Sequence, residues 1–419
     1  MNKNYNKFII KKEKIFKYLI FIFFIFLIYN NSNIFLFKEN KLKNKIIQYI
    51  KQSKINKIKK FKYENNIPQI KKYIHLLRKG YIRINSFYNN NFKPKISFVT
   101  TVYNKENYLY SFICSIQNQY LKEFELIIVD DCSSDRSIEI IKNFIAKDLR
   151  IKLIRNKKNM GTLYSRYKGA IYSKGKYIIF VDSDDIILKE GLLNSYNYIK
   201  KNNLDMIQFN YVMEKNNKTF INRKCYKYGL IIYQPILSYI YYYQNNSGIE
   251  NNYNLWDKLV KKKIVLKALR YIGLKFLNKK IIIENDVIIL FALFRNSKSF
   301  QYIDELGYYY FRNNKDSLSN TIDDKNKANQ IIYSIFSNIE FLYKKTENTK
   351  FSKYFCLFKF NQGYNRYINS FIYLNNETLK IVYSVITKLL QSNYISLKNK
   401  ILIRNISNEI YKITYYYSI

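Results

Sequence analysis

Histidine is almost absent from this chain of 419 residues, in which His75 is the only one. A lone histidine excludes metal sites built from several imidazoles. Its position ahead of the predicted core also excludes a Ser-His-Asp triad there. Proton transfer must therefore depend on carboxylates, and we expect a bound cation to assist them.

Cysteine and acidic residues are also scarce. The four cysteines are widely spaced and include no Cys-x-x-Cys pair, which argues against a zinc knuckle or a small disulfide-held domain. Asp and Glu number 30 against 72 Lys and Arg, a formal net charge of +42. Lysine is spread through nearly every segment and forms no distinct patch, so we expect no nucleic-acid partner.

Apolar residues, by contrast, are abundant. Hydrophobic side chains make up 48% of the chain and aromatic ones 18%, which excludes a wholly disordered protein. The length suffices for two or three domains of ordinary size, or for one large core with appendages.

The N-terminal region predicts a membrane anchor. Residues 1–14 are basic, and residues 15–37 are apolar apart from one short polar break. A helix needs about 20 residues to cross a membrane, and no small-residue cleavage site follows this stretch. We expect an uncleaved signal anchor, in preference to a cleaved signal peptide, and a single-pass membrane protein. In a eukaryote the remainder would lie in the lumen of the endoplasmic reticulum or Golgi, although the basic stretch 38–62 leaves the orientation open.

Beyond this anchor the sequence divides into four segments. Residues 38–94 are rich in Lys and Asn and predict a stem. Residues 95–215 alternate apolar β-rich runs with helical patterns, which predicts a Rossmann-like α/β fold with a mostly parallel sheet flanked by helices. Residues 216–320 continue the same domain less regularly, and residues 321–419 predict a helical C-terminal tail.

Polar residues stand where three of the predicted strands end. The first strand leads into Thr101–Asn104, the second into Asp130–Asp131, and the fourth into Asp182–Asp185. Ligands of such sheets bind outside the carboxyl ends of the strands. Carboxylates gathered there repel one another unless a cation lies between them, and Mg²⁺ or Mn²⁺ commonly joins one or two carboxylates to substrate phosphates. The sequence therefore predicts a diphosphate-binding site with a divalent cation.

The order of these motifs resembles that of family 2 glycosyltransferases, which have the GT-A fold. The resemblance covers about residues 95–210 and continues more faintly to 320. It is carried by four motifs in family order: Val102-Tyr103-Asn104, Val129-Asp130-Asp131 with Ser133 and Asp135, Asn159-Met160-Gly161 with Arg166, and Asp182-Ser183-Asp184.

The resemblance implies a glycosyltransferase that takes a sugar from a UDP- or GDP-type donor. It implies a place for Asp131, helped by Asp130, near the base, for Asp182 near the ribose or sugar, and for Asp184 on a Mn²⁺ or Mg²⁺ ion. The whole predicted donor site comprises Thr101, Tyr103, Asp130, Asp131, Gly161, Arg166, Asp182 and Ser183. Arg166 is expected to contact nucleotide or phosphate, with a solvated helix arginine as the alternative.

Similar enzymes carry a Glu-Asp pair at the start of a helix, where this chain has Asn285-Asp286. Asp286 is our candidate base, with Glu284 as second choice and a helix-capping acid as the alternative role. One base and one cation suffice for an inverting transfer to a hydroxyl of a glycan, lipid or protein. Trp256 is expected either to stack on a sugar or to lie in the core. Because Asn285 departs from the family pattern, the alternative function is a degenerate fold that only binds glycans or partners.

Overall fold

The computed structural model describes residues 67–80, 87, 92–215, 218–222, 232–233, 254–311, 325–345, 360, 374–392 and 397–416. All of them lie in the compact unit Lys60–Ile419. The predicted anchor at 15–37 and most of the predicted stem fall outside the described residues.

The described strands form one sheet of 10 strands, whose main path runs β3-β2-β1-β4-β9-β6-β10-β5. Four strands of the N-terminal half pair in parallel, as the sequence predicts. They are β1 (Ile96–Val102), β2 (Phe124–Asp130), β3 (Ile151–Arg155) and β4 (Tyr177–Asp182). Because consecutive strands are linked by helices, their carboxyl ends all open on the same edge.

The second half of the sheet mixes directions, which the sequence does not reveal. β9 (Lys258–Lys261) runs antiparallel to both β4 and β6 (Met206–Lys215), whereas the long β10 (Ser299–Phe311) pairs in parallel with β6. Three short strands complete the sheet: β5 (Ile186–Ile187), β7 (Lys218–Asn222) and β8 (Ile232–Tyr233). The fold is therefore of the α/β class with a mostly parallel N-terminal half.

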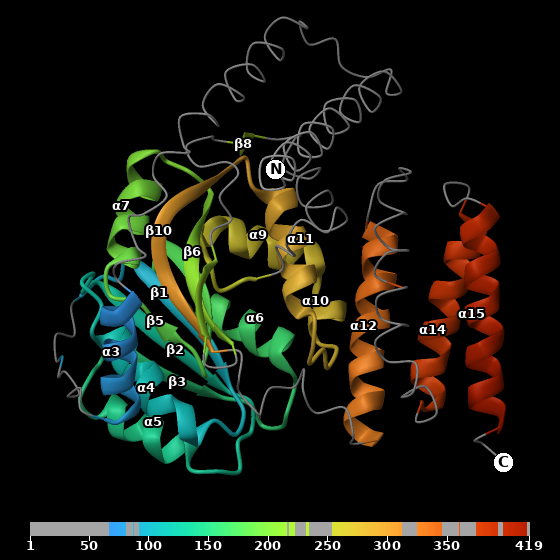
Figure 1. Cartoon of the computed structure of the whole chain (residues 1–419), viewed down its shortest axis with the longest axis horizontal. Coiled ribbons are helices and arrows are strands. Elements are labelled where there is room, and N and C mark those ends of the chain that lie inside the picture. The colour runs from blue at the N-terminus through green and yellow to red at the C-terminus, as the bar shows by residue number, and fades with distance from the viewer. Residues whose placement is uncertain are drawn as a thin grey trace, which may run out of the picture. The chain divides into compact units, whose positions relative to one another are not determined.

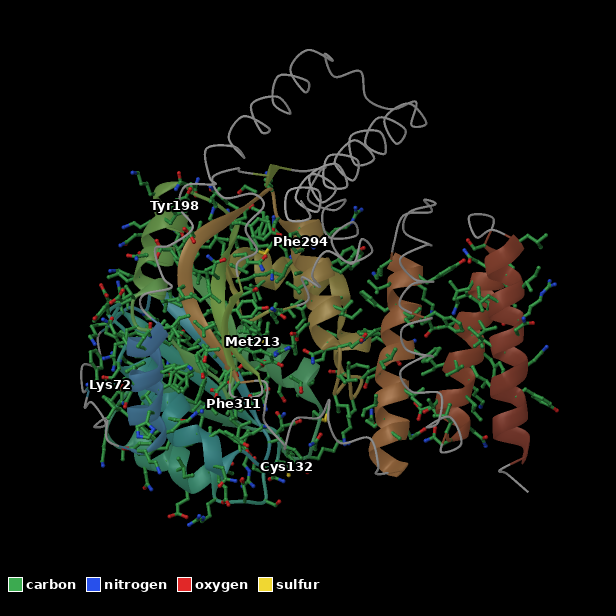
Figure 2. All side chains as sticks on the ribbon, viewed as in Figure 1. Lys72, Cys132, Tyr198, Met213, Phe294 and Phe311 are labelled. Carbon is green, nitrogen blue, oxygen red and sulfur yellow. The ribbon has the colours of Figure 1, made fainter. Side chains whose placement is uncertain are left out.

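Helices cover both faces of this sheet (Figure 1). Side chains alternate between the faces, so that Phe98 of β1 packs in one core cluster and its neighbour Val99 in the other. One cluster includes residues of α3 (Ile67–Arg78), α4 (Glu106–Gln117), α5 (Ser137–Ile145) and α7 (Gly191–Lys201). The other includes residues of α6 (Thr162–Tyr172), α9 (Lys262–Ile272), α10 (Leu274–Leu277) and α11 (Asn285–Asn296). Side chains fill the space between sheet and helices on both sides (Figure 2).

Helix α3 shows that part of the predicted stem packs on the domain. Ile74 and Leu77 are buried in the same core cluster as α4, and the Arg78 guanidinium lies 4.1 Å from the ring centroid of Phe311 at the end of β10. His75, on the same helix, is exposed.

Among the described residues, three helices follow β10: α12 (Lys325–Lys345), α14 (Asn376–Gln391) and α15 (Leu397–Tyr416). Apolar residues on all three extend the cluster beneath α11. Glu340 of α12 accepts a hydrogen bond from the Lys388 ammonium of α14 at 2.6 Å. The segment predicted as a helical tail therefore packs on the domain core.

The prediction of a single-pass membrane protein is wrong for the described part of the chain, where no helix is suited to cross a membrane. α11 is apolar but has only 12 residues, and the 21 residues of α12 include charged side chains. A crossing needs length and continuous apolarity together.

Candidate active site

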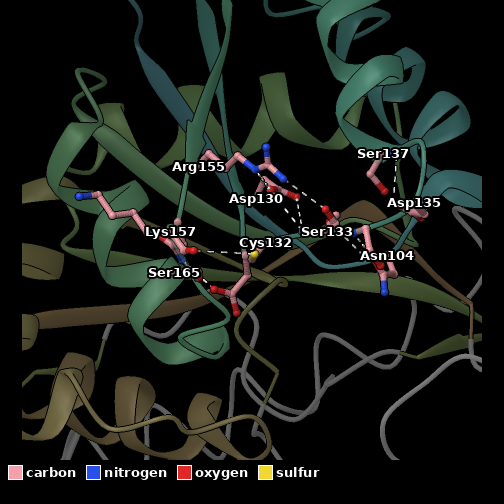
Figure 3. Close-up of polar contacts among 12 residues, drawn as sticks. Asn104, Asp130, Cys132, Ser133, Asp135, Ser137, Arg155, Lys157 and Ser165 are labelled. Carbon is pink, nitrogen blue, oxygen red and sulfur yellow. Dashed lines mark hydrogen bonds and ion pairs between the residues drawn. The ribbon is translucent and has the colours of Figure 1, made fainter.

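Loops that follow β1 and β2 lock each other at the carboxyl edge of the sheet (Figure 3). Asn104 has a φ of 51°, in the left-handed region that asparagine tolerates well. Its N–H donates to Ser133 Oγ at 3.1 Å, and its Oδ1 accepts from the Ser134 N–H at 2.9 Å. Tyr103, directly before it, is 49% exposed, so its ring is accessible to a ligand.

The first turns of α4 and α5 hold each other in the same way. The Asp135 carboxylate accepts from the N–H groups of Glu106 and Ser137 at 2.9 and 3.0 Å. In return, Glu106 Oε2 accepts from the Arg136 N–H at 2.9 Å. Burial alone would raise the pKa of Asp135, but these hydrogen bonds lower it below its ordinary value. N–H groups at both helix starts are thus satisfied by side chains.

Asp130 is buried and fully engaged within this edge. Its two oxygens accept from the Ser133 N–H at 3.2 and 3.3 Å, and the Arg155 guanidinium lies 3.2 Å from Oδ2 (Figure 3). Its carboxylate therefore shapes the turn after β2.

Asp131 anchors the loop that precedes α6. Oδ1 accepts from Asn156 Nδ2 at 2.7 Å and from the Met160 N–H at 2.8 Å, and Oδ2 accepts from the Gly161 N–H at 2.8 Å. The second and third motifs of the sequence are therefore one hydrogen-bonded unit.

Gly161 allows the carboxyl edge of the sheet to lie close to the segment that leads to α11. It has a φ of +87°, and a Cβ there would lie 2.9 Å from the carbonyl oxygen of Ile281. Any other residue would therefore clash with backbone as well as strain its own. The glycine of the third motif is thus required by a contact 120 residues further along the chain.

Asp182, the last residue of β4, and the three residues after it contact different parts of the fold. Asp182 Oδ1 lies 2.7 Å from Arg166 Nη2, and Ser183 Oγ donates to the Thr101 carbonyl at 3.0 Å. Asp185, which the sequence analysis did not single out, accepts from Tyr308 Oη at 2.8 Å and from the Phe311 N–H at 2.9 Å.

Asp184 has an ammonium partner: Lys105 Nζ donates to its Oδ2 at 2.9 Å, and both side chains are partly exposed. No group of three or more metal-ligating side chains occurs within the described ranges. A single carboxylate at this edge fits a divalent cation only when substrate oxygens and water supply the other ligands, as Mg²⁺ commonly requires.

Burial and neighbouring charge perturb the carboxyls of this edge. Burial, together with the charges of Asp286 and Asp184, raises the pKa of Asp182 to about 6, against the opposing effect of Arg166. Burial and the charges of Asp184 and Asp182 raise the pKa of Asp185 well above its ordinary value. A cluster of titratable groups perturbed in this way is typical of a functional site.

Arg166 connects this edge to α11. Its side chain is only 4% exposed; Nη1 donates to the side-chain oxygens of Asn285 and Asp286, and Nη2 donates to Asp182. Burial alone would lower the pKa of Arg166, but the two carboxylates raise it. The alternative of a solvated helix arginine is therefore wrong, while the predicted contact with nucleotide stays a prediction.

The candidate base Asp286 stands in the first turn of α11, and its side chain is 24% exposed. Only Oδ1 has a hydrogen-bond partner among the residues that the structure describes. A buried ammonium lies nearby: Lys258 donates to Asp257 Oδ1 at 2.7 Å. Burial lowers the pKa of Lys258, and the charges of Asp257 and Asp286 oppose that effect.

Trp256 is a core aromatic and not an exposed platform for a sugar. It is 4% exposed and stacks on Tyr308 with ring centroids 4.4 Å apart and an interplanar angle of 15°. The Tyr308 hydroxyl donates to Asp185 and accepts from the Asp182 N–H, so the stacked rings help to hold the end of β4.

Three charged residues contribute to this site although the sequence assigned no individual role to them: Lys105, Asp185 and Lys258. Each stands beside a motif that was recognised, directly after Tyr103-Asn104, after the acidic triplet and after Trp256-Asp257. Their position next to a recognised motif could have indicated a role, but their contact partners are known only from the fold.

Comparison with known proteins agrees with this geometry. The family model "Glycosyl transferase family 2" matches residues 97–255. An uncharacterized glycosyltransferase of Methanocaldococcus jannaschii is 30% identical over 249 residues, which cover 58% of this chain and 78% of that protein. Another from Haemophilus influenzae is 44% identical over 118 residues, 28% of this chain and 47% of that protein. The chain belongs to glycosyl transferase family 2 and is a glycosyltransferase.

The fold is also similar to a solved structure. Staphylococcus aureus TarS 1–349, in complex with UDP-GlcNAc, superposes with a TM-score of 0.53 at 16% sequence identity and covers 76% of this chain and 89% of that one. This likeness confirms the GT-A type of α/β fold that the sequence predicts.

The predicted location in a membrane of the endoplasmic reticulum or Golgi, with a lumenal catalytic domain, is wrong. The relatives described above come from a bacterium and an archaeon, cells without these compartments, and the described helices include none that could span a membrane.

Proposed function

We propose that this glycosyltransferase moves a sugar from a UDP-sugar to an acceptor hydroxyl with inversion at the anomeric carbon, assisted by a divalent cation. One observation carries the proposal: the buried Arg166 guanidinium contacts both Asp182 at the donor edge and Asp286 on α11. A carboxylate suited to take a proton is thereby held beside the motif expected to bind the donor, which is the arrangement that a direct displacement needs.

For the donor, the exposed ring of Tyr103 and the loops anchored by Asp130 and Asp131 are the proposed surroundings of the nucleoside. Hydrogen bonds of the Thr101 carbonyl, the Ser183 hydroxyl and the Gly161 N–H shape the same edge. The UDP-GlcNAc complex of the structural neighbour TarS supports a uridine nucleotide in this chain.

For the cation, Asp184 is the proposed ligand from the protein. A Mn²⁺ or Mg²⁺ ion shared with the diphosphate would neutralise charge on the departing nucleotide. Lys105 would then exchange its contact with Asp184 for one with a phosphate oxygen.

For the acceptor, Asp286 is the proposed base. Arg166 holds Oδ1, so Oδ2 remains to accept the hydroxyl proton. The acceptor oxygen forms a bond to the anomeric carbon as the bond from that carbon to the diphosphate breaks, and UDP leaves with the electron pair. Asn285, at the position of the family glutamate, still offers an oxygen to Arg166, which favours an active enzyme over the degenerate alternative.

The test is release of nucleotide from UDP-N-acetylglucosamine, UDP-glucose, UDP-galactose and GDP-mannose in the presence of Mn²⁺. We expect release from one of the UDP-sugars, with kcat lowered about 10²- to 10⁴-fold by Asp286→Asn. Asp184→Asn and removal of the cation by EDTA should both lower the rate of nucleotide release. Glu139→Gln, an exposed carboxylate on α5, is the matched control and should change nothing.

Two results would decide against this proposal. Equal release by the wild type, Asp184→Asn and Asp286→Asn would dismiss the assigned residues. Tight binding of UDP without release from any donor would favour the binding module that the sequence left as the alternative.

A further inference from the structure

Helix α12 lies outside the segment that the family model matches, yet its buried face is not purely apolar. Ser334 and Asn338 are 0% and 1% exposed, among the buried side chains of Ile331, Ile335 and Leu342. Buried polar groups destabilise a fold unless they are hydrogen-bonded, so their partners indicate what they do.

Each of these two side chains, and Gln330 one turn earlier, has a partner in the backbone that leads to the candidate base, and Ser334 Oγ also donates to the Gln330 carbonyl within α12 at 2.8 Å. Gln330 Nε2 donates to the Lys280 carbonyl at 2.5 Å, and Ser334 Oγ accepts from the Ile282 N–H at 3.2 Å. Asn338 Nδ2 donates to the Glu284 carbonyl at 3.2 Å and lies 3.5 Å from that of Ile283. Gln330, Ser334 and Asn338 are spaced four residues apart, so they form one row on the helix. We call this row the α12 brace.

The segment held by the α12 brace is conformationally unusual. Glu284 has a φ of 55°, in the left-handed region, immediately before Asn285 and Asp286. That conformation is unfavourable for a residue other than glycine and persists only where the surroundings enforce it. Asn338 supplies a donor to the carbonyl of this same residue.

The direction of the chain at Glu284 decides where Asp286 points. Two residues later the Asp286 carboxylate meets Arg166, and the opposite side of the segment packs against Gly161 through Ile281. The segment is thus clamped between the donor edge on one side and α12 on the other.

We propose that Gln330, Ser334 and Asn338 are positioning residues for the catalytic base, with Asn338 the most important of them. The inference rests on the proposed function, because it assumes that Asp286 takes the acceptor proton. It makes the C-terminal helices part of the transferase machinery, although none of the three residues touches substrate.

The first experiment replaces Asn338 by leucine, which keeps the volume and removes the donor. With the UDP-sugar that the wild type uses, we expect kcat for UDP release to fall about 10-fold or more, since small misplacements of a reacting group cost up to about 100-fold. KM for the donor and the dissociation constant for UDP should stay within about twofold of wild type, since the donor edge is built separately. Ser337→Ala is the matched control, a serine of the same helix with 0% exposure.

A second measurement separates positioning from a general loss of packing. Hydrogen exchange of the backbone amides at 281–287 should accelerate in Asn338→Leu and in the milder Ser334→Ala, but not in Ser337→Ala. Faster exchange throughout α12, or an unchanged kcat with faster exchange at 281–287, would overturn the inference.

A double substitution distinguishes failure of this inference from failure of the proposed function. If Asn338 acts through Asp286, Asn338→Leu should cause no further loss of kcat in an Asp286→Asn background. An equal fold-loss in both backgrounds would refute positioning while leaving the base assignment intact. An undiminished kcat in Asp286→Asn alone would instead refute the base assignment of the proposed function.

Discussion

The carboxyl edge of the sheet, where we propose that the donor binds, and the start of α11, which carries the proposed base, are held in different ways. At the carboxyl edge, short motifs form hydrogen bonds with one another: the Asn104 N–H donates to Ser133, and the Gly161 N–H donates to Asp131. At α11, the backbone before Asp286 depends on α12, some 50 residues further along. The comparison teaches that the predicted donor motifs are held by contacts with one another, whereas the segment before the candidate base is held by packing against a distant helix. Four predictions probe this division, from the largest expected effect to the smallest.

Replacing Arg166 by leucine should have the largest effect, because Arg166 joins the two regions. It leaves Asp182 and Asp286 without their shared cation; because these two side chains are 33% and 24% exposed, the loss of unfolding free energy should lie below the about 3–5 kcal/mol that is typical of a fully buried pair. UDP release should be lost even under conditions where the variant is folded. Chemical denaturation and the release assay measure the two losses, with Arg270→Leu, an exposed helix arginine, as control. Equal stability and equal UDP release in the Arg166→Leu and Arg270→Leu variants would contradict the idea that Arg166 links the two regions.

Replacing Gly161 by alanine tests the contact between the regions. The new Cβ would meet the Ile281 carbonyl at 2.9 Å in a residue whose φ is +87°, so we expect a loss of about 1–3 kcal/mol. Donor affinity and kcat should both fall, because the added Cβ would displace both the loop that contains Gly161 and the segment that leads to Asp286. Gly273→Ala, with the same φ of +87° and no atom within 4 Å of the added Cβ, controls for backbone strain alone. If the two alanine variants lose equal stability, the contact with Ile281 is not the cause.

The carboxyl edge of the sheet and the contact between α12 and α14 should respond oppositely to pH. The pKa of Asp182 is raised from 3.8 to about 6, so its contribution to stability is present below pH 3.8 and is lost as the pH rises through 6. The pKa of Glu340, between α12 and α14, is lowered from 4.5 to about 2: burial opposes this shift, and the Lys388 ammonium outweighs burial. Its contribution is present above pH 4.5 and is lost as the pH falls towards 2.

Measurement of the unfolding free energy from about pH 2 to about pH 8 tests both pH dependences, that of Asp182 and that of Glu340. Asp182→Asn should remove the change between pH 3.8 and 6, and Glu340→Gln should remove the change below pH 4.5. A single variant that abolishes both would show that the regions are not electrostatically separate.

Replacing Trp256 by phenylalanine should have the smallest effect. Loss of part of the stack on Tyr308 should cost about 1 kcal/mol of stability. KM for donor and acceptor should be unchanged, because the ring is 4% exposed. A raised KM with unchanged stability would restore the sugar-stacking role that the structure argues against.

Residues 95–215 were predictable because each strand and helix there repeats a local pattern, and the motifs fall at strand ends. The antiparallel β9 was not, because its four residues carry no signal of direction, and neither was the partner of Arg166, which lies 120 residues away. The membrane prediction failed because hydropathy in one segment was extended to the location of the whole protein.

The sequence by itself determined the family, the parallel half of the sheet and the residues that line its carboxyl edge, since all of these follow from local periodicity and short motifs. Only the tertiary structure decided that Arg166 serves two carboxylates, that Trp256 is buried, and that α12 contacts the segment before Asp286. Those features depend on which distant surfaces meet when the core closes, and no local pattern contains that information.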